Sequence, residues 1–393
     1  MNSRKDLQAT HQIIQLLEFS KNQSECDLDS LPGIYTVIDS EGQILKGNRG
    51  LGDVFGVNHE MVLARNLSSL FDQTQWEAFK TKMDQVACGE VVEQGSQIDI
   101  KDSHGAVHHY LWNIGLVGQR PEHAPSLFSI VGKDVTKLLH ESKIRSRMEG
   151  ELNTAKLIQD TLFPDPSGTF GESSVAGFYE VASECGGDWW YYTQVAGKVY
   201  LWVGDVTGHG VPAALVTSAA RSAVSVIEGS DLGPANALRI LSRAVFDTAK
   251  GQRVMTGLVA SVDLKTGECL IASASHEAGI LIPGGEIAGI KDFVDLSFGP
   301  TPPLGLKRDV VYQDKKITLK PGDRLVFFTD GIYEIQDRDG KLWSRQNINR
   351  TFLPFVQANR GAIDLTDSVR KSINDWRNGA ALNDDVTFVA FKF

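Results

Sequence analysis

The sequence has few cysteines, no long apolar run and no excess of basic residues, and each shortage excludes a class of protein. Only four cysteines occur among 393 residues, without the paired spacing of a disulfide framework or a zinc knuckle. No stretch approaches the roughly 20 apolar residues that a transmembrane helix needs. The net charge of -10 argues against nucleic acid or an anionic membrane as the main partner.

The remaining composition is that of a globular protein. Hydrophobic residues make up 42% of the chain, which is long enough to form two or more domains with their own cores. The N-terminus carries charges where a signal peptide would have its apolar segment. Together with the low cysteine content, this predicts a protein of the reducing cytoplasm.

The first 30 residues have no visible chemistry. Asp6–Phe19 places apolar residues among polar ones at helical spacing, which predicts a short amphipathic helix packed on the next domain or on its copy in a dimer. A polar connector, Cys26–Leu31, follows.

Residues 31–134 show short strands separated by glycine and aspartate. Ile34–Ile38 and Gln43–Asn48 predict a hairpin around the turn Asp39–Gly42. Helical segments near Met61 and over residues 76–86 come next, and then three strands near residues 91–100, 107–117 and 127–134. This order, with Phe55-Gly56 and the closing residues 130–136, resembles a PAS sensor domain. The resemblance implies an antiparallel sheet around a small pocket, a small ligand as one potential partner, and a signal that leaves through the next helix.

Two patterns in this region have competing interpretations. The glycines favour loops over a phosphate-binding cradle, because no strand–loop–helix unit surrounds them. The histidines favour surface or core positions over metal ligation, because adjacent strand residues point to opposite faces. The residues concerned are Gly47, Gly50, Gly52 and Gly56, and His104, His108 and His109.

Residues 135–165 form the connection to the second domain. Apolar residues recur every three or four positions and predict a long helix with one apolar stripe, ended by Pro164 and Pro166. The stripe consists of Ile144, Met148, Leu152, Ala155, Ile158 and Leu162. Pairing with the same helix of a second chain would give a homodimer through residues 135–163. Packing on its own domain is the alternative.

Residues 166–393 contain blocks of strands and helices, not strict alternation, which predicts an α+β class with packed sheets. Aspartates follow or precede apolar strands at four places: Gly186-Gly187-Asp188, Gly204–Gly210, Thr329-Asp330-Gly331 and Asp384-Asp385. If these strand ends meet, the carboxylates need cations to offset their repulsion. Hard oxygen ligands without cysteine or histidine favour Mg²⁺ or Mn²⁺.

These motifs, in this order and with Leu319–Asp323, resemble the bacterial SpoIIE-type, PP2C-like (PPM) serine/threonine phosphatases. The resemblance implies a PPM-type β-sandwich flanked by helices and metal-dependent hydrolysis of phosphoserine or phosphothreonine. The order of PAS domain, long helix and phosphatase is further similar to stress-response regulators. Their substrate is a phosphorylated anti-sigma-factor antagonist with a STAS domain.

The resemblance also implies roles for single residues. Asp205 would bridge two metal ions with help from the Val206 carbonyl, Asp330 and Asp384 would complete one shell, and Asp188 would support the second ion. Two such ions, about 3.5 to 4 Å apart, lower the pKa of a bridging water toward neutrality. Supporting positions around these ligands are Asp385, Gly187 and Gly331.

Three further expectations concern His209, the helix after it, and departures from the family pattern. His209 is either a general acid or a residue that only orients its Gly-His-Gly turn. Pro212, Ala213 and Leu215 begin a helix that the resemblance marks as a regulatory switch, with plain core packing as the alternative. Tyr191 stands where the family usually has an aspartate, and Ser275 where it often has glycine.

A catalytically weak sensor or scaffold, acting by protein binding in a partner-switching pathway, is the alternative function. The presence of all principal carboxylates argues against it.

Overall fold

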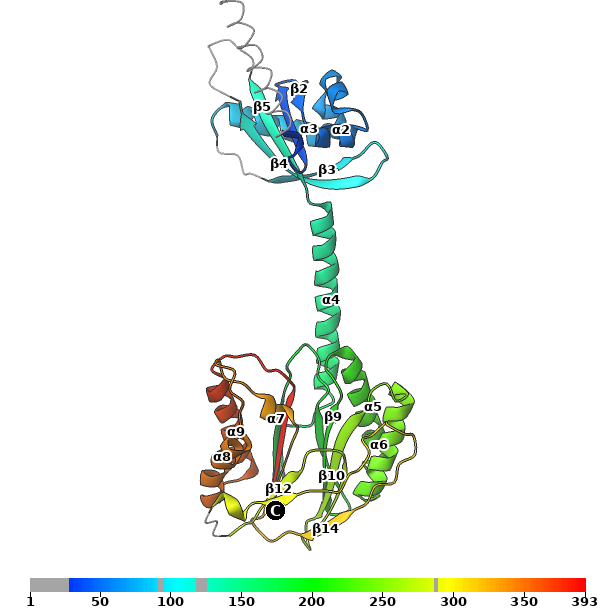
Figure 1. Cartoon of the computed structure of the whole chain (residues 1–393), viewed down its shortest axis with the longest axis vertical. Coiled ribbons are helices and arrows are strands. Elements are labelled where there is room, and N and C mark those ends of the chain that lie inside the picture. Colours follow the sequence, from blue (N-terminus) through cyan, green and yellow to red (C-terminus); the bar gives the residue numbers. More distant parts are fainter. Residues whose placement is uncertain (1–27, 91–94, 118–125, 286–288) are drawn as a thin grey trace, which may run out of the picture. The chain divides into compact units, whose positions relative to one another are not determined.

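The computed structural model describes residues 28–90, 95–117, 126–285 and 289–393 (Figure 1). The predicted helix at Asp6–Phe19 lies outside the described residues. The chain divides into two compact units, Met1–Arg147 and Met148–Phe393, and the division falls within helix α4 (Thr136–Asp160). Both units mix helices with antiparallel sheets, which confirms the α+β class.

The first unit is a five-stranded antiparallel sheet in the order β2-β1-β5-β4-β3. Its strands are β1 (Ile34–Asp39), β2 (Ile44–Gly47), β3 (Ser96–Lys101), β4 (Val107–Leu116) and β5 (Leu127–Asp134). Its helices are α2 (Arg49–Phe55), two 3₁₀ helices (His59–Ala64 and Leu67–Leu70) and α3 (Gln73–Ala87). A capping box between Asp72 and Gln75 fixes the start of α3, and Phe79 from that helix contacts Trp112 from β4 edge to face.

The glycine-rich segment after β2 is a helix, so the prediction of loop glycines was wrong for Gly50 and Gly52. Asn48 caps α2 by accepting a hydrogen bond from the Leu51 N–H, and Gly56 ends it with a left-handed φ of 65°. A Cβ at Gly50 would lie 2.1 Å from the Gly33 carbonyl oxygen. Glycine is therefore required here by a close backbone contact, which overrides its low helix propensity.

The two predicted histidine neighbours on β4 have acidic partners. His108 contacts Asp102 at 3.2 Å and Asp134 at 3.1 Å, and His109 contacts Asp99 at 2.5 Å. These pairs are consistent with the surface interpretation of both histidines.

Two antiparallel sheets form the second unit. One has the order β14-β11-β10-β9-β8 and the other the order β13-β12-β15-β16-β7-β6. The strands of the first are β8 (Trp189–Val195), β9 (Lys198–Val206), β10 (Met255–Asp263), β11 (Glu268–Ala274) and β14 (Lys315–Thr318). Those of the second are β6 (Ser167–Phe170), β7 (Ser173–Glu180), β12 (Gly279–Ile282), β13 (Val294–Leu296), β15 (Arg324–Phe328) and β16 (Val386–Lys392).

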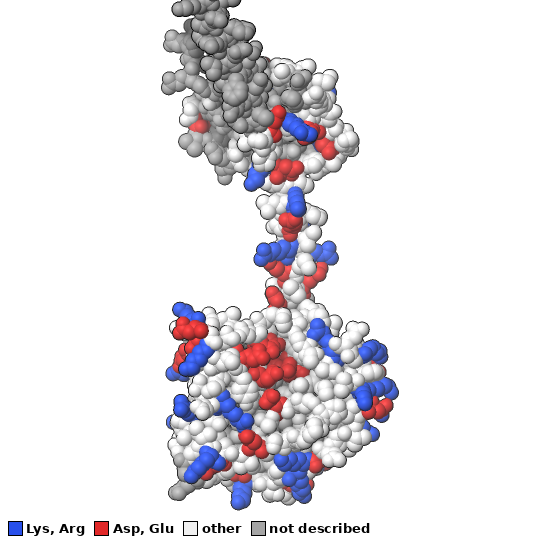
Figure 2. All heavy atoms as spheres, in the orientation of Figure 1, with Lys and Arg blue, Asp and Glu red and all other residues white. Residues whose placement is uncertain are grey.

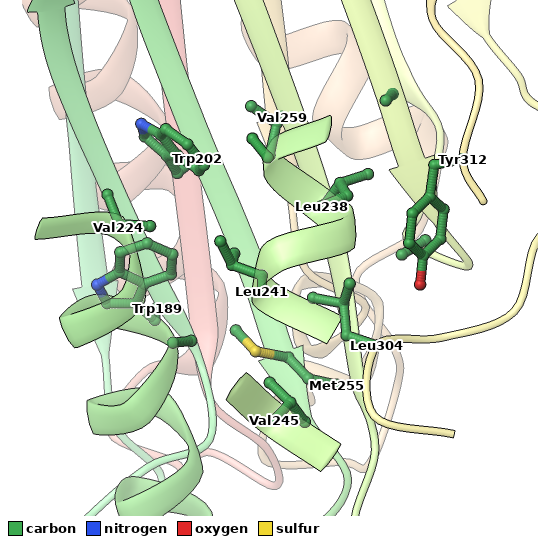
Figure 3. Packing of buried hydrophobic residues seen from close by; sticks show 14 of the residues in the cluster. Trp189, Trp202, Val224, Leu238, Leu241, Val245, Met255, Val259, Leu304 and Tyr312 are labelled. Carbon is green, nitrogen blue, oxygen red and sulfur yellow. The ribbon is translucent and has the colours of Figure 1, made fainter. Parts of the chain in front are cut away.

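Helices cover the outer face of each sheet, as Figure 1 shows for this unit. They are α5 (Val211–Ile227) and α6 (Pro234–Ala249) on the first sheet, α8 (Arg345–Gln357) and α9 (Ala362–Arg377) on the second, and the short α7 (Gly331–Glu334) and a 3₁₀ helix (Ile290–Asp292) in connections. One apolar core fills the space between the sheets, and one lies under each helix pair. Figure 3 shows the core under α5 and α6, where Trp189 and Trp202 lie near Val224 and Leu241.

Strand direction places the loops that matter for function. β9 carries Asp205 near its last residue, and β15 ends two residues before Asp330. Because β15 and β16 are antiparallel and pair Phe328 with Phe388, the start of β16 lies beside the end of β15. Among the described residues, no helix is long and apolar enough to span a bilayer.

Candidate active site

Strand register brings the first two predicted ligands together. In the pairing of β8 with β9, Trp189 lies opposite Gly204, so Asp188 and Asp205 follow at the same end of the ladder. Asp188 is buried and Asp205 is partly buried. These two carboxylates belong to the first sheet of the second unit.

The second sheet contributes Asp330, Asp384 and Asp385. The Thr329 N–H donates to the Thr387 carbonyl at 3.2 Å, and the Thr387 N–H donates to the Thr329 hydroxyl oxygen at 3.0 Å. These bonds continue the ladder beyond the strand and fix the loop that holds Asp330 beside the one that holds Asp384 and Asp385.

Hydrogen bonds join the two sheets at the acidic residues. The Thr329 hydroxyl donates to Asp188 Oδ2 at 2.6 Å. Asp385 accepts from the Gly187 N–H at 2.6 Å and from the Ala182 N–H at 2.9 Å. Asp385 therefore holds the Gly-Gly-Asp loop, and its supporting role for metal ligands stays a prediction.

Two of the predicted glycines are required by close approach. A Cβ at Gly187 would lie 2.7 Å from the Val206 carbonyl oxygen, and a Cβ at Gly331 would lie 1.9 Å from the Asp385 carbonyl oxygen. Any side chain at either position would displace a loop that carries an aspartate.

The electrostatic environment of these carboxylates disfavours their ionised form. Burial and the charges of Asp330, Asp384 and Asp385 raise the pKa of Asp205 to about 7. Burial, and then the charge of Asp205, raise the pKa of Asp188 well above its usual value. Asp205 thus lies within electrostatic reach of Asp188, Asp330 and Asp384, although these residues come from distant parts of the chain.

The sequence prediction missed one acidic neighbour, Glu334 on α7. Burial and the charges of Asp384 and Asp330 raise the pKa of Glu334. Figure 2 shows the resulting group of acidic side chains on one face of the second unit. Glu334 lies four residues after Asp330, a spacing that would have identified it once a helix was predicted there.

The donor chemistry fits hard divalent cations, because every side chain in the cluster offers carboxylate oxygen. Within the described ranges, no three His, Cys, Asp or Glu side chains form a ready-made metal-binding group. The same ranges contain no Lys or Arg ion pair to Asp188, Asp205, Asp330 or Asp384. The cluster therefore has the chemistry of a cation site and lacks an internal counter-charge.

Among the described residues, no hydrogen bond or ion pair joins His209 to the carboxylates. Its side chain is exposed in a turn between Gly208 and Gly210, whose φ values of 79° and 82° are left-handed. The Gly210 N–H donates to the Cys185 carbonyl at 2.8 Å, which ties this turn to the Gly-Gly-Asp loop. The role of His209 stays a prediction.

The three predicted switch residues occupy the first turn of α5. Ala213 is fully buried in the core under that helix, whereas Pro212 and Leu215 are exposed. The regulatory role of this turn stays a prediction.

Residues 196–393 match the family described as Stage II sporulation protein E (SpoIIE), and residues 28–138 match the PAS fold.

Two curated relatives come from Bacillus subtilis (strain 168). Phosphoserine phosphatase RsbU is 24% identical over 251 residues, which are 63% of this chain and 72% of RsbU. Phosphoserine phosphatase RsbP is 22% identical over 189 residues, 47% of this chain and 45% of RsbP. The alignment thus spans less than half the length of RsbP.

Among solved structures, the SiaA-PP2C domain of Pseudomonas aeruginosa superposes with a TM-score of 0.52 and 22% sequence identity. The superposition covers 64% of this chain and 98% of that one. This likeness establishes a shared fold.

Proposed function

The chain belongs to the SpoIIE family, and on this premise we propose that it is a protein serine/threonine phosphatase that depends on Mn²⁺ or Mg²⁺. The observation that carries the proposal is the meeting of Asp188, Asp205, Asp330 and Asp384 at adjoining strand ends, with no Lys or Arg ion pair to them in the described part of the chain. The relatives RsbU and RsbP are named phosphoserine phosphatases, which supports the phosphate ester of phosphoserine as the bond hydrolysed.

The proposed ligands divide by sheet. Asp205, with the Val206 carbonyl, lies on the first sheet and faces Asp330 and Asp384 from the second, so a cation between them would neutralise both sides. Asp188 accepts a hydrogen bond from the Thr329 hydroxyl. Two bound Mg²⁺ or Mn²⁺ ions would acidify a water molecule and stabilise the charge of the transferring phosphoryl group. His209 is proposed to protonate the leaving oxygen or to orient its turn.

The domain arrangement is also part of the proposal. We assign residues 1–30 to an N-terminal helix and connector, residues 31–134 to a PAS sensor, residues 135–165 to a linker and residues 166–393 to the phosphatase. The sensor, with or without a small ligand, would control the phosphatase through the linker and the first turn of α5. The proposed substrate is a phosphorylated regulatory protein with a STAS domain, in the cytoplasm.

A homodimer through residues 135–163 is supported by the surface of α4. Ile144 and Met148 are exposed, although both belong to the predicted apolar stripe. Ile144→Glu should convert the dimer to a monomer in light scattering, because burying an unpaired charge in the seam is costly. Lys143→Glu on the same helix is the matched control. Wild-type protein that is monomeric at every concentration tested would contradict the dimer.

The enzymatic proposal is tested with a phosphoserine-containing STAS protein and Mn²⁺. We expect release of inorganic phosphate that stops with EDTA and resumes with added Mn²⁺. Absence of phosphate release under all three conditions would instead favour a scaffold that acts by binding.

A further inference from the structure

Helix α4 buries a polar side chain and exposes its apolar neighbours. Gln159 is 4% exposed, and it is the one buried residue of this helix. Leu157 and Ile158, directly before it, are 68% and 61% exposed. Burial of a carboxamide is costly unless its donors and acceptor are bonded, so the surroundings of Gln159 must satisfy both ends of the group.

The nitrogen and the oxygen of the Gln159 carboxamide both bind the backbone of Gly186. The Gln159 Nε2 donates to the Gly186 carbonyl at 2.7 Å, and the Gly186 N–H donates to Gln159 Oε1 at 3.1 Å. This two-way pairing fixes the peptide groups on either side of Gly186, two residues before Asp188. No shorter or charged side chain can both donate and accept in this geometry.

The position of Gly186 leaves no room for a side chain. A Cβ there would lie 1.9 Å from the Tyr179 hydroxyl oxygen and 2.2 Å from Asp385 Oδ2. The next residue, Gly187, donates to Asp385, as described above. Gln159 and Asp385 thus hold successive residues of one loop from two different elements.

The same carboxamide also contacts helix α5. The Gln159 Nε2 lies 3.5 Å from the Thr217 hydroxyl oxygen, and that hydroxyl donates to the Ala214 carbonyl at 2.9 Å. Thr217 lies less than two turns after Pro212, where α5 begins near Asp205. One side chain therefore contacts both the loop of Asp188 and the helix that follows Asp205.

We propose that Gln159 is a positioning residue for the acidic site, which sets the Gly186–Asp188 loop and the start of α5 in register for cation binding. The inference rests on the proposed function, because it assigns to Gln159 a role in forming the cation site. A change in the last turn of α4 would reach the acidic residues through this carboxamide.

The test compares Gln159→Leu, which keeps the size but removes the hydrogen bonds, with Leu157→Ala as a matched control on the same helix. Mn²⁺ binding to the full chain is measured by calorimetric titration, and hydrogen exchange is measured over residues 182–190 with EDTA present. For Gln159→Leu we expect an Mn²⁺ Kd about 10- to 100-fold weaker, the range for residues that orient metal ligands, and faster exchange in the loop. Leu157→Ala should leave both unchanged.

The outcomes separate the two claims. If wild-type protein binds no Mn²⁺ but Gln159→Leu still speeds exchange in the loop, the proposed function fails and the positioning contact stands. If wild-type protein binds Mn²⁺ and Gln159→Leu changes neither Kd nor exchange, the role of Gln159 is overturned. Should Gln159→Leu not fold, the same two measurements are made on Gln159→Glu. This variant retains the acceptor oxygen but loses the amide donor.

Discussion

The pKa values of clustered aspartates shift in opposite directions in the two units. In the first unit, His108 lies between Asp102 and Asp134. A hydrogen bond from the Ala106 N–H is the main cause that lowers the pKa of Asp102, and bonds from Thr136 and His108 lower the pKa of Asp134 despite its partial burial. In the second unit, burial and mutual repulsion raise the pKa of Asp188 and Asp205.

The difference shows which acidic group already has its partners and which one would need a bound cation. Carboxylates whose charge is already stabilised by hydrogen-bond donors and a histidine contribute to the stability of the fold and need no bound cation. Carboxylates that crowd together without a Lys or Arg partner repel one another, and a bound cation would relieve that repulsion. Substitutions and metal removal test this contrast directly.

Replacing a carboxylate of the second unit should abolish catalysis. For Asp205→Ala we expect kcat/KM with p-nitrophenyl phosphate and Mn²⁺ to fall about 1000-fold, because several kcal/mol of charge stabilisation is lost and each 1.4 kcal/mol is tenfold. Asp102→Ala in the first unit should stay within about twofold of wild type. Equal losses for both variants would contradict the contrast.

Mn²⁺ should stabilise the folded chain. At a free concentration about 100 times its Kd, the free energy of unfolding should rise by about 2.7 kcal/mol, which thermal or urea denaturation measures. Asp205→Asn should remove this gain, whereas Asp134→Asn should retain it. A gain that persists in Asp205→Asn would place the cation elsewhere.

Stability without metal should depend on pH with opposite signs in the two units. The folded pKa of Asp205, about 7, exceeds the ordinary value of 3.8, so the folded state binds more protons between these values. In EDTA, its contribution to the free energy of unfolding should therefore decrease as pH rises from about 4 to about 7, by at least about 1.4 kcal/mol. Asp102 and Asp134, with lowered pKa values, contribute stability above their ordinary pKa that is lost as pH falls. Calorimetry of wild type and Asp205→Asn checks the sign, and an unchanged slope in the variant would refute the assignment.

The exposed pair between His109 and Asp99 should matter least. Asp99→Asn should lower the free energy of unfolding by no more than about 0.5 kcal/mol in chemical denaturation, because solvent screens such pairs. A loss of several kcal/mol would mean that this pair is part of the core of the first unit.

Local signals predicted regular elements well where packing and propensity agree. Residues 324–328 are apolar after one arginine, a pattern that favours a buried strand, and they form β15. Pro234 begins α6 after Gly233, a common place for proline in the first turn of a helix. The short elements β6, β13 and α7 were not predicted, because three or four residues carry too little periodicity. In α2, tertiary contact at Gly50 overrode the expectation of a loop.

The site was predicted in its residues but not in its contacts. The aspartates stand beside strand ends and glycines, which made them visible. Thr329, which binds Asp188, and Gln159, which binds Gly186, resemble many other polar residues in their segments. The helical period of α4 predicted an apolar stripe that includes Ile144, yet the buried residue of that helix is a glutamine.

The sequence by itself determined most of the longer strands and helices, the class of the fold and the positions of the aspartates, because these depend on neighbours along the chain. Only the tertiary structure decided that Asp188 and Asp205 face Asp330 and Asp384, and that Gln159 reaches Gly186. Such contacts join residues far apart in the chain, and they depend on sheet register and packing, which no local pattern encodes.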